Sequence, residues 1–411
     1  MISGSPGRPD SAGRPDSGGS PGRPGSAGRP DRVVEVALDA SAVPDQPAGA
    51  GRYVVELARA LALRRECGLT LLARVDDGPR WAGIAAGKRV LAVVPASRPR
   101  RLFYEQARLA SVVAELRSPA IEVHHGPHYT MPRRSRVPCV VTVHDMTFFD
   151  HPEWHERSKV TWFRAAMRHS VRHAAAIVCV SESTAGRLRE ILSPRCPVTV
   201  VAHGVDHARF AAEEADPGTD REVLATLGLE RPYLLHLGTV EPRKGIGDLV
   251  TAFDLLAPAH PEIDLVLAGG VGWKAGATLQ AIGAARAGGR VRQLGYVSEA
   301  SIPSLLRGAR AVVYPSLEEG FGLPALEAMA CGAPLVTTSG TAMAELAGSS
   351  ALLVPPGEPR ALATAIETAL AAEDSPEAAR RRASGLETAA RYTWEACAEG
   401  HLEVYRQAAG A

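Results

Sequence analysis

The chain has 411 residues, of which 45% are hydrophobic and 22% charged, so it can bury a large core and has room for two domains of ordinary size. Its 46 Lys and Arg residues against 45 Asp and Glu give a formal net charge of +1, which excludes a global attraction to nucleic acid or acidic lipid. No apolar run approaches the roughly 20 residues that span a bilayer, and the first residues lack the apolar segment of a signal peptide. We therefore expect a cytoplasmic protein without a nucleic-acid partner.

The six cysteines are scattered along the chain, with neither a CxxC pair nor a cluster of His and Cys at metal-ligand spacing. We predict reduced thiols in the core and no metal site. Residues 1–31 repeat a Gly-Arg-Pro-Asp unit among Ser, Gly and Pro, with almost nothing apolar. Such a segment cannot offset its ordering entropy, so we predict a disordered, inert extension, with an interaction tail as the alternative.

From Val33 onward, short aliphatic runs alternate with longer amphipathic stretches, which is typical of βα units around a parallel sheet. The predicted strands are 33–38, 69–73, 90–94, 121–124, 139–143, 176–180 and 198–201, followed by 233–237, 265–268, 291–294, 311–314, 335–337 and 351–354. Residues 207–231, rich in Ala, Glu, Asp and Gly, separate the two sets and mark a domain junction. The pattern predicts an α/β chain of two Rossmann-like doubly wound parallel-sheet domains, whose strands end at a shared central cleft where substrates bind.

In the first half, the glycine turn Ala48–Arg52 precedes a helix with apolar residues at i, i+3, i+4 and i+7. The turn is a candidate phosphate or substrate contact. It does not match a dinucleotide fingerprint, because Val54 stands where the third glycine belongs, and this argues against a Rossmann dehydrogenase.

Strand 139–143 ends at His144, at the cleft, where an imidazole can hydrogen-bond a hydroxyl group or a developing charge. Residues 98–136 hold eight Arg against three Glu, interleaved with apolar side chains such as Phe103. This segment has two interpretations, a face for an anionic acceptor or the inner membrane surface, and a solvated helix with snorkelling arginines.

In the second half, strand 233–237 leads into Gly238–Gly245, so Arg243 and Lys244 lie on a loop at the carboxyl end of a strand. There they could neutralise a departing diphosphate, although such a turn by itself is also typical of a solvated loop. Gly269, after strand 265–268, predicts a second close approach of backbone to ligand.

Strand 311–314 runs into a glycine turn and a helix that Pro324 opens and Gly332 follows. Gly320 and Gly322 leave backbone N–H groups open at the helix N-terminus, where the macrodipole favours an anion such as a nucleotide diphosphate. Glu319 and Glu327 flank this turn with seven residues between them, and carboxylates accept hydrogen bonds from vicinal hydroxyls. For either acid alone, a solvated or dipole-complementing role is the simpler reading, and the combination favours a site.

Together, Gly238–Gly245, Val291–Val297 and Tyr314–Gly332 closely resemble the retaining glycosyltransferase family 4, and the likeness extends from Val33 to Gln407. Within the family, the chain is similar to the O-antigen mannosyltransferase-like subgroup, given His125–Tyr129 and Val143–Met146. The resemblance implies a GT-B fold, a reaction without metal or cofactor, and retention of anomeric configuration. It divides the chain into an acceptor-binding domain at 32–206, a linker at 207–231, a sugar-nucleotide-binding domain at 232–385 and a helix at 386–411 that crosses back to the first domain.

The resemblance also implies roles for particular residues. Glu319 and His144 would contact the donor hexose, Glu327 the ribose, and Lys244 with Arg243 the diphosphate. Backbone N–H groups of the glycine turn would contact sugar and phosphate, Gly51 would lie near the reacting centre, and Thr239 stands where many relatives carry an arginine. The residues predicted for the site are His144, Arg243, Lys244, Glu319, Gly51, Thr239, Gly269, Gly320, Phe321, Gly322, Leu323 and Glu327.

The resulting prediction is a hexosyltransferase that uses a nucleoside diphosphate sugar, with GDP-mannose favoured and UDP-sugars next, and a hydroxyl acceptor. Two alternatives stay open: a catalytically silent sugar-nucleotide-binding partner protein and a sugar phosphorylase of the same fold.

Overall fold

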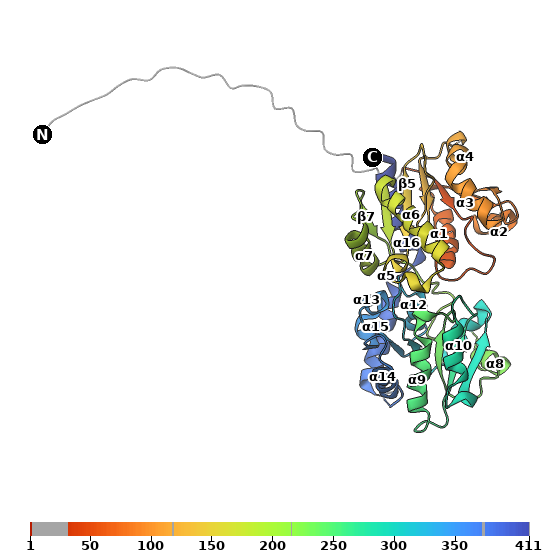
Figure 1. Ribbon diagram of the computed structural model, residues 1–411, viewed down its shortest axis with the longest axis vertical. Helices are drawn as coiled ribbons and strands as arrows, with labels where there is room; N and C mark the ends of the chain where they lie inside the picture. Colours follow the sequence, from red (N-terminus) through yellow and green to blue (C-terminus); the bar gives the residue numbers. More distant parts are fainter. Residues whose placement is uncertain (2–31, 117–118, 215, 372–374, 411) are drawn as a thin grey trace, which may run out of the picture. The chain divides into compact units, whose positions relative to one another are not determined.

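The computed structural model describes Met1 and residues 32–116, 119–214, 216–371 and 375–410. The predicted tail, residues 1–31, lies outside this described part except for Met1. Residues Val33–Ala411 make up one compact unit with two sheets, and the strand pairs of both sheets are parallel (Figure 1). This is the predicted pair of Rossmann-like folds.

The first lobe comprises the seven-stranded sheet β3-β2-β1-β4-β5-β6-β7 and the helices packed on it. Its strands are β1 (Val34–Asp39), β2 (Cys67–Arg74), β3 (Arg89–Val94), β4 (Val123–Gly126), β5 (Cys139–Val143), β6 (Ala176–Cys179) and β7 (Val198–Val200). Its helices are α1 (Ala50–Leu63), α2 (Gly78–Ile84), α3 (Arg98–Ala107), α4 (Leu109–Glu115), α5 (Thr147–Asp150), η1 (Pro152–Trp154), α6 (Arg157–His173), α7 (Glu182–Leu192) and, from the end of the chain, α16 (Trp394–Gly410).

The second lobe comprises the six-stranded sheet β10-β9-β8-β11-β12-β13 and its helices. Its strands are β8 (Tyr233–Leu237), β9 (Asp264–Ala268), β10 (Val291–Gly295), β11 (Ala311–Tyr314), β12 (Leu335–Thr338) and β13 (Ala351–Val354). Its helices are α8 (Thr219–Thr226), η2 (Pro242–Lys244), α9 (Ile246–Leu256), α10 (Gly276–Gly283), η3 (Gly288–Arg290), η4 (Glu299–Ser301), α11 (Ile302–Arg307), α12 (Leu323–Ala330), α13 (Ala342–Ala347), η5 (Gly348–Ser350), α14 (Pro359–Ala371) and α15 (Pro376–Ala390).

Each predicted strand overlaps an observed one, because continuous aliphatic runs of four to eight residues are what a sheet buried on both faces requires. Neighbouring residues of one strand accordingly enter cores on opposite faces of the sheet, as Leu38 and Ala37 do in β1. The strand ends differ by a few residues: β4 starts at Val123, which pairs with Val36, and continues through His125. Residues 219–226, inside the predicted linker, form α8, which packs against α11.

The strand orders place the functional region. In both sheets the chain adds strands outward on one side, then crosses over and builds the other side, so a switch point lies between β1 and β4 and between β8 and β11. Loops that leave neighbouring strands in opposite directions at a switch point open a crevice at the carboxyl edge of the sheet, and ligands of doubly wound folds bind there. The loops after β1, β4, β8 and β11 therefore border these crevices.

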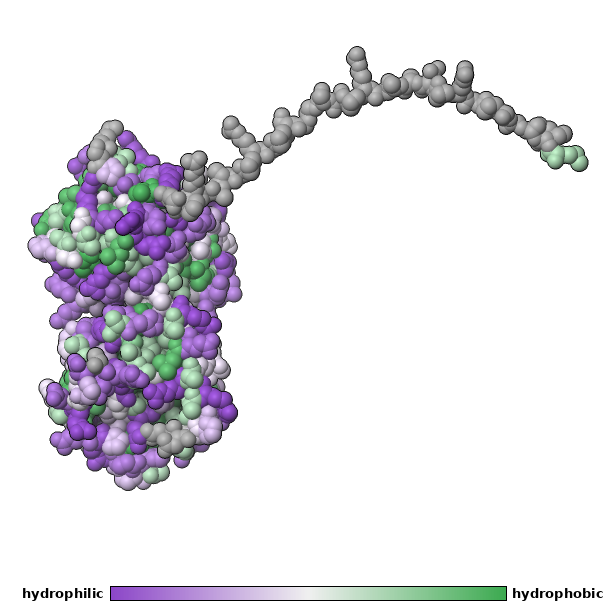
Figure 2. Space-filling model, turned by 180° about the vertical axis from the view of Figure 1, so that it is seen from behind, coloured by the Kyte–Doolittle hydropathy of each residue, from purple (hydrophilic) through white to green (hydrophobic). Residues whose placement is uncertain are grey.

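The surface of the molecule is mixed in character, since hydrophilic and apolar side chains are interspersed over the face drawn in Figure 2. Helix α3, from the arginine-rich segment, exposes Phe103 beside Arg100 and buries Glu105. Among the described helices, none has the length and apolar character that crossing a membrane requires. All six cysteines fall in described ranges and are free thiols, five of them buried and Cys196 partly exposed.

A chain of buried hydrogen bonds fastens α16 to the first sheet. His401 Nδ1 donates to the carbonyl of Cys397 (2.8 Å), so its Nε2 accepts from the Tyr53 hydroxyl (2.8 Å). Tyr53 then accepts from Thr142 (2.9 Å), and Thr142 accepts from His125 Nε2 (2.8 Å). Burial lowers the pKa of both histidines, which are therefore neutral, and the donors and acceptors run in a single direction along the chain.

The same chain extends to a second contact with α16, because His125 Nδ1 is left to accept from the Tyr405 hydroxyl at 2.7 Å. His125 is thus a structural histidine. Every member of the chain is needed, because a buried polar group that loses its partner keeps the full cost of its desolvation.

We expect Tyr53→Phe to lower the free energy of unfolding by about 1 to 3 kcal/mol, because in the core it leaves His401 Nε2 without its donor and the Thr142 hydroxyl without its acceptor. Urea denaturation measures this change. Tyr296→Phe is the matched control, since the Tyr296 side chain is 59% exposed and its substitution should leave the unfolding midpoint in place. Equal stability of the two variants would contradict the proposed network.

Candidate functional site

A cavity of about 440 Å³ lies between the two lobes, at the carboxyl ends of the strands that border the switch points. The loops after β1 and β5 contribute one wall, and those after β8, β9, β10 and β11 contribute the other. Every residue predicted for the site lines this cavity except Gly51. Those that line it are His144, Thr239, Arg243, Lys244, Gly269, Glu319, Gly320, Phe321, Gly322, Leu323 and Glu327.

Gly51 is buried within its turn. A Cβ atom at this position would point at the loop before it, 3.3 Å from Pro47 Cβ, so the residue faces the packing of its own turn and not the cavity. The neighbours Pro47, Gly49, Ala50 and Arg52 line the cavity instead.

Contacts from both lobes fix the glycine turn before α12. Gly322 has a φ of 100° and precedes a helix that carries Pro324 in its first turn, so the backbone needs glycine where it enters the helix. A Cβ on Gly320 would lie 1.8 Å from the carbonyl oxygen of His144, and the Ser181 hydroxyl donates to the Gly320 carbonyl at 2.7 Å. The first lobe therefore holds the turn that opens α12 in the second.

Glu319 is the centre of a buried cluster of charges. Its carboxylate accepts from Lys244 Nζ at 2.5 Å, from the Arg243 guanidinium at 2.8 Å and from the Ser316 hydroxyl at 2.9 Å. Arg243 also contacts Glu241 at 2.7 Å. Burial by itself would raise the pKa of Glu319, but Arg243 and Lys244 outweigh it and lower that pKa to about 2, so the acid is ionised.

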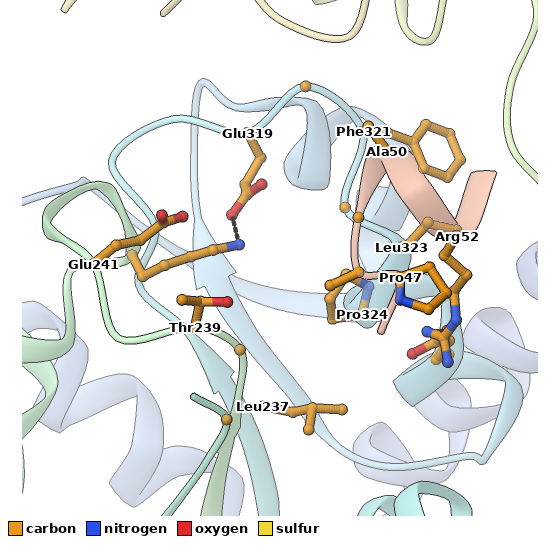
Figure 3. A pocket seen from close by; sticks show the side chains of 18 of the residues that line it. Pro47, Ala50, Arg52, Leu237, Thr239, Glu241, Glu319, Phe321, Leu323 and Pro324 are labelled. Carbon is orange, nitrogen blue, oxygen red and sulfur yellow. Dashed lines mark hydrogen bonds and ion pairs between the residues drawn. The ribbon is translucent and has the colours of Figure 1, made fainter. Parts of the chain in front are cut away.

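Glu327 is buried and meets a base from the opposite lobe. Its Oε1 accepts from Arg52 at 2.5 Å, and Arg52 also contacts Glu299. Arg52 and Pro47 lie across the cavity from Thr239 and Glu241 (Figure 3). Burial raises the pKa of Glu327 to about 7 although Arg52 opposes this, so this acid titrates near neutral pH.

Arg52 lines the cavity but is not among the residues predicted from the sequence. The available signal was a charged side chain in the first helical turn after a glycine loop, at the carboxyl end of the first strand. The family resemblance points to Gly51 in this turn, and the sequence pattern does not indicate which atoms of the turn face a cleft.

His144 is buried at the tip of β5, and its Nε2 donates to the carbonyl of Pro127 at 2.7 Å. Burial lowers its pKa, so the ring is neutral and Nδ1 carries a lone pair. The ring packs edge-on against Tyr53, with centroids 5.1 Å apart. A neutral imidazole held in this tautomer can accept a hydrogen bond from a hydroxyl group.

The arrangement suits a ligand with both anionic groups and hydroxyls. The N-terminus of α12 and the pair Arg243 and Lys244 favour negative charge, while Glu319, Glu327 and His144 offer acceptors. In the part of the chain that the structure describes, no group of three or more His, Cys, Asp or Glu side chains could hold a metal ion.

Two parallel-sheet lobes with such a cavity between their carboxyl edges define the GT-B class of glycosyltransferases. Solved structures share the fold: sucrose-phosphate synthase from Thermosynechococcus elongatus matches with a TM-score of 0.72 at 22% identity, over 91% of this chain and 98% of that one. HepE from Anabaena, in complex with UDP-glucose, matches with a TM-score of 0.69 at 19% identity, over 90% and 98%.

Sequence comparison identifies the family. The model "Glycosyltransferase Family 4" matches residues 47–209, and "Glycosyl transferases group 1" matches residues 225–385. O-antigen chain mannosyltransferase B of Escherichia coli is 32% identical over 374 residues, which cover 87% of this chain and 96% of that protein. The chain belongs to glycosyltransferase family 4 and is an enzyme of the hexosyltransferase class.

We expect Glu319→Gln to lower the free energy of unfolding at pH 7 by about 3 to 5 kcal/mol, because it leaves the buried Lys244 ammonium without its acid and removes one of the two acids that pair with Arg243. The folded carboxyl has a pKa of about 2, below its ordinary value of 4.5, so its contribution is complete above pH 4.5 and is lost as the pH falls toward 2.

Urea denaturation between pH 7 and pH 4 measures both effects, and the difference between wild type and variant should shrink at the acid end. Glu377→Gln is the control, since Glu377 is 70% exposed in its pair with Arg381, and such surface pairs contribute about 0 to 1 kcal/mol. A loss for Glu319→Gln no larger than that of the control would show that the cluster adds nothing to stability.

Proposed function

We propose that the chain transfers a hexosyl group from a nucleoside diphosphate sugar to an acceptor hydroxyl, with retention of anomeric configuration. One observation carries this proposal: the cavity combines the N-terminus of an eight-residue helix, a basic pair and two buried acids. A diphosphate needs the first two, and the vicinal hydroxyls of ribose and hexose need the acids.

The position of each group supports the role that we assign to it. The diphosphate lies against the N-terminus of α12 and is neutralised by Arg243 and Lys244, which then share their charge between Glu319 and the ligand. Arg243 replaces the arginine that relatives carry at the position of Thr239. Glu319 accepts hydrogen bonds from the hexose hydroxyls, and Glu327 accepts them from the ribose hydroxyls. The backbone N–H groups of the turn at Gly320–Leu323, in the second lobe, bind sugar and phosphate.

The donor that we favour is GDP-mannose, followed by UDP-sugars. The similarity to a protein named O-antigen chain mannosyltransferase B supports the first, and the shared fold with HepE in complex with UDP-glucose supports the second. The acceptor carries a free hydroxyl and approaches from the first lobe, where His144 faces the donor sugar. The family resemblance makes the transfer independent of a metal cofactor.

The reaction needs no nucleophilic side chain. The bond between the anomeric carbon and the diphosphate oxygen breaks, the acceptor oxygen attacks from the same face, and the acceptor proton passes to the departing phosphate. The protein lowers the barrier by stabilising the charge that develops on that phosphate, and Lys244 and Arg243 are preorganised for this by their bonds to Glu319.

A thermal-shift screen of GDP-, UDP- and dTDP-sugars tests donor binding. We expect one nucleotide series to raise the melting temperature by several degrees, because a ligand at 100 times its Kd stabilises the folded state by about 2.7 kcal/mol. Turnover of the stabilising sugar nucleotide, by transfer or slow hydrolysis, separates an enzyme from a silent binding protein. Stabilisation by sugar phosphates with no response to sugar nucleotides would instead indicate a phosphorylase.

We expect Lys244→Ala to reduce kcat by roughly 100- to 1,000-fold, because one preorganised donor to the developing charge is lost. Steady-state assays with the sugar nucleotide found in the screen measure this. Lys88→Ala is the matched control, since Lys88 donates to the carbonyls of Arg64 and Cys67 and does not line the cavity. Near wild-type turnover of Lys244→Ala would refute the assigned role.

A further inference from the structure

The contact between Arg52 and Glu327 joins the two lobes across the cavity. Arg52 lies in the first turn of α1, and one of its terminal nitrogens donates to Glu327 Oε1 at 2.5 Å. Its other terminal nitrogen contacts Glu299 in η4, so both ends of the guanidinium fork are used. The Arg52 side chain is only 16% exposed and that of Glu327 only 4%, so solvent screens this pair weakly.

Neighbouring groups hold Arg52 in place. Arg209 contacts the Glu299 carboxylate at 2.7 Å, and the ring of Phe210 lies beneath both guanidinium groups, 4.7 Å from Arg209 and 5.9 Å from Arg52. The position of Arg52 is therefore fixed from three sides. A planar guanidinium held in this way can orient a carboxylate by a hydrogen bond of defined direction.

The charge of Glu327 depends on these contacts. Arg52 and Arg209 favour the ionised form of Glu327, whereas Glu299 and Glu56 oppose it. The buried hydroxyl of Tyr314 also interacts with this carboxyl group. Burial is the largest effect and raises the pKa of Glu327 to about 7, while Arg52 is the largest effect in the opposite direction. Removal of Arg52 would leave a mostly protonated carboxyl at neutral pH.

We propose that Arg52 is a positioning residue for the donor ribose: it favours the ionised form of Glu327 and turns the free oxygen of that carboxylate toward the cavity, so that ribose recognition in the second lobe requires the first. This inference rests on the proposed function, in which Glu327 accepts from the ribose. Arg52 occupies Oε1, and Oε2 is the oxygen left for the vicinal hydroxyls. Arg52 itself need not touch the donor.

The opposite role for the same contact is a latch that the donor must break. A latch would take both carboxylate oxygens or fill the space in front of them. The contact takes one oxygen, and Glu327 still lines the cavity together with Arg52. We therefore favour positioning over obstruction, and the two roles predict opposite changes in affinity.

The experiment compares two probes that differ only in the ribose: GDP and 2′,3′-dideoxy-GDP, or the UDP pair if UDP gives the larger thermal shift. Isothermal titration calorimetry between pH 6 and pH 9 gives the ratio of the two Kd values, which measures ribose recognition. Titration of the phosphate and the base cancels in this ratio. The proteins are wild type, Arg52→Met, Arg52→Lys and Glu327→Gln, with Arg59→Met as the matched control, since Arg59 lies on the same helix and pairs with Glu56 at the surface.

In the wild type, the preference for the ribonucleotide should increase with pH and reach half its maximum near pH 7, because only the ionised carboxylate accepts from both hydroxyls. Arg52→Met should reduce this preference at pH 7 by about 10-fold and shift its midpoint upward by about one pH unit or more. Arg52→Lys should retain part of the wild-type preference, and Arg59→Met should retain all of it. Glu327→Gln should show a weak preference that does not change with pH.

Three results would overturn the inference. If Arg52→Met keeps the wild-type preference for the ribonucleotide and the wild-type pH midpoint, Glu327 does not need Arg52. If Arg52→Met binds both nucleotides more tightly than the wild type, the contact is a latch. An equal loss for both nucleotides, without a shift in midpoint, would assign Arg52 to general stability of the cleft.

The proposed function fails separately. If the wild type binds neither GDP nor UDP nor their sugars, the donor assignment is wrong and this inference falls with it. If the wild type binds ribo- and dideoxynucleotides equally, the donor assignment stands. Ribose recognition by Glu327, and the positioning of Glu327 by Arg52, are then wrong.

Discussion

The cavity depends on one constraint, the parallel direction of all strands in both sheets. Parallel strands bring the loops that follow them to a single edge, and the switch points between β1 and β4 and between β8 and β11 leave an opening at that edge. Residues far apart in the sequence, such as Arg52, His144, Lys244 and Glu319, consequently line one space. A change of loop sequence alters the ligand without altering this frame, which accounts for one fold serving many donors and acceptors.

Paired charges prepare the cavity for its ligand. Each buried acid already has a base, Glu319 with Arg243 and Lys244, and Glu327 with Arg52. Since an unpaired buried charge is costly, these pairs favour the ionised forms and orient the groups before a donor binds. The two acids differ: the basic pair lowers the pKa of Glu319 to about 2, whereas burial raises that of Glu327 to about 7. One acid is thus permanently charged, and the other responds to its surroundings near neutral pH.

The lobes meet through contacts that also shape the site. The first lobe holds the α12 turn through Ser181, and the backbone of Gly320 lies directly against that of His144. Helix α16 belongs by sequence to the end of the chain but packs on the first sheet, where its His401 bonds to Tyr53 and its Tyr405 bonds to His125. The last segment thereby ties the second half of the chain back to the first. Side chains that recognise the ligand and side chains that join the lobes are in part the same.

The sequence by itself determined the strands, the two-lobed α/β fold and the turn at Gly320–Pro324, because aliphatic runs, glycines and prolines act through local geometry and burial. Together with the family resemblance, it also predicted eleven of the residues that line the cavity. Only the tertiary structure decided that Arg52 and not Gly51 faces the cavity, and that Glu319 and Glu327 each have a base as partner. The structure also placed His125 in a hydrogen-bond chain with Tyr405, 280 residues away. Such pairings form between residues that no periodicity connects, and they depend on the direction of side chains once two sheets have packed.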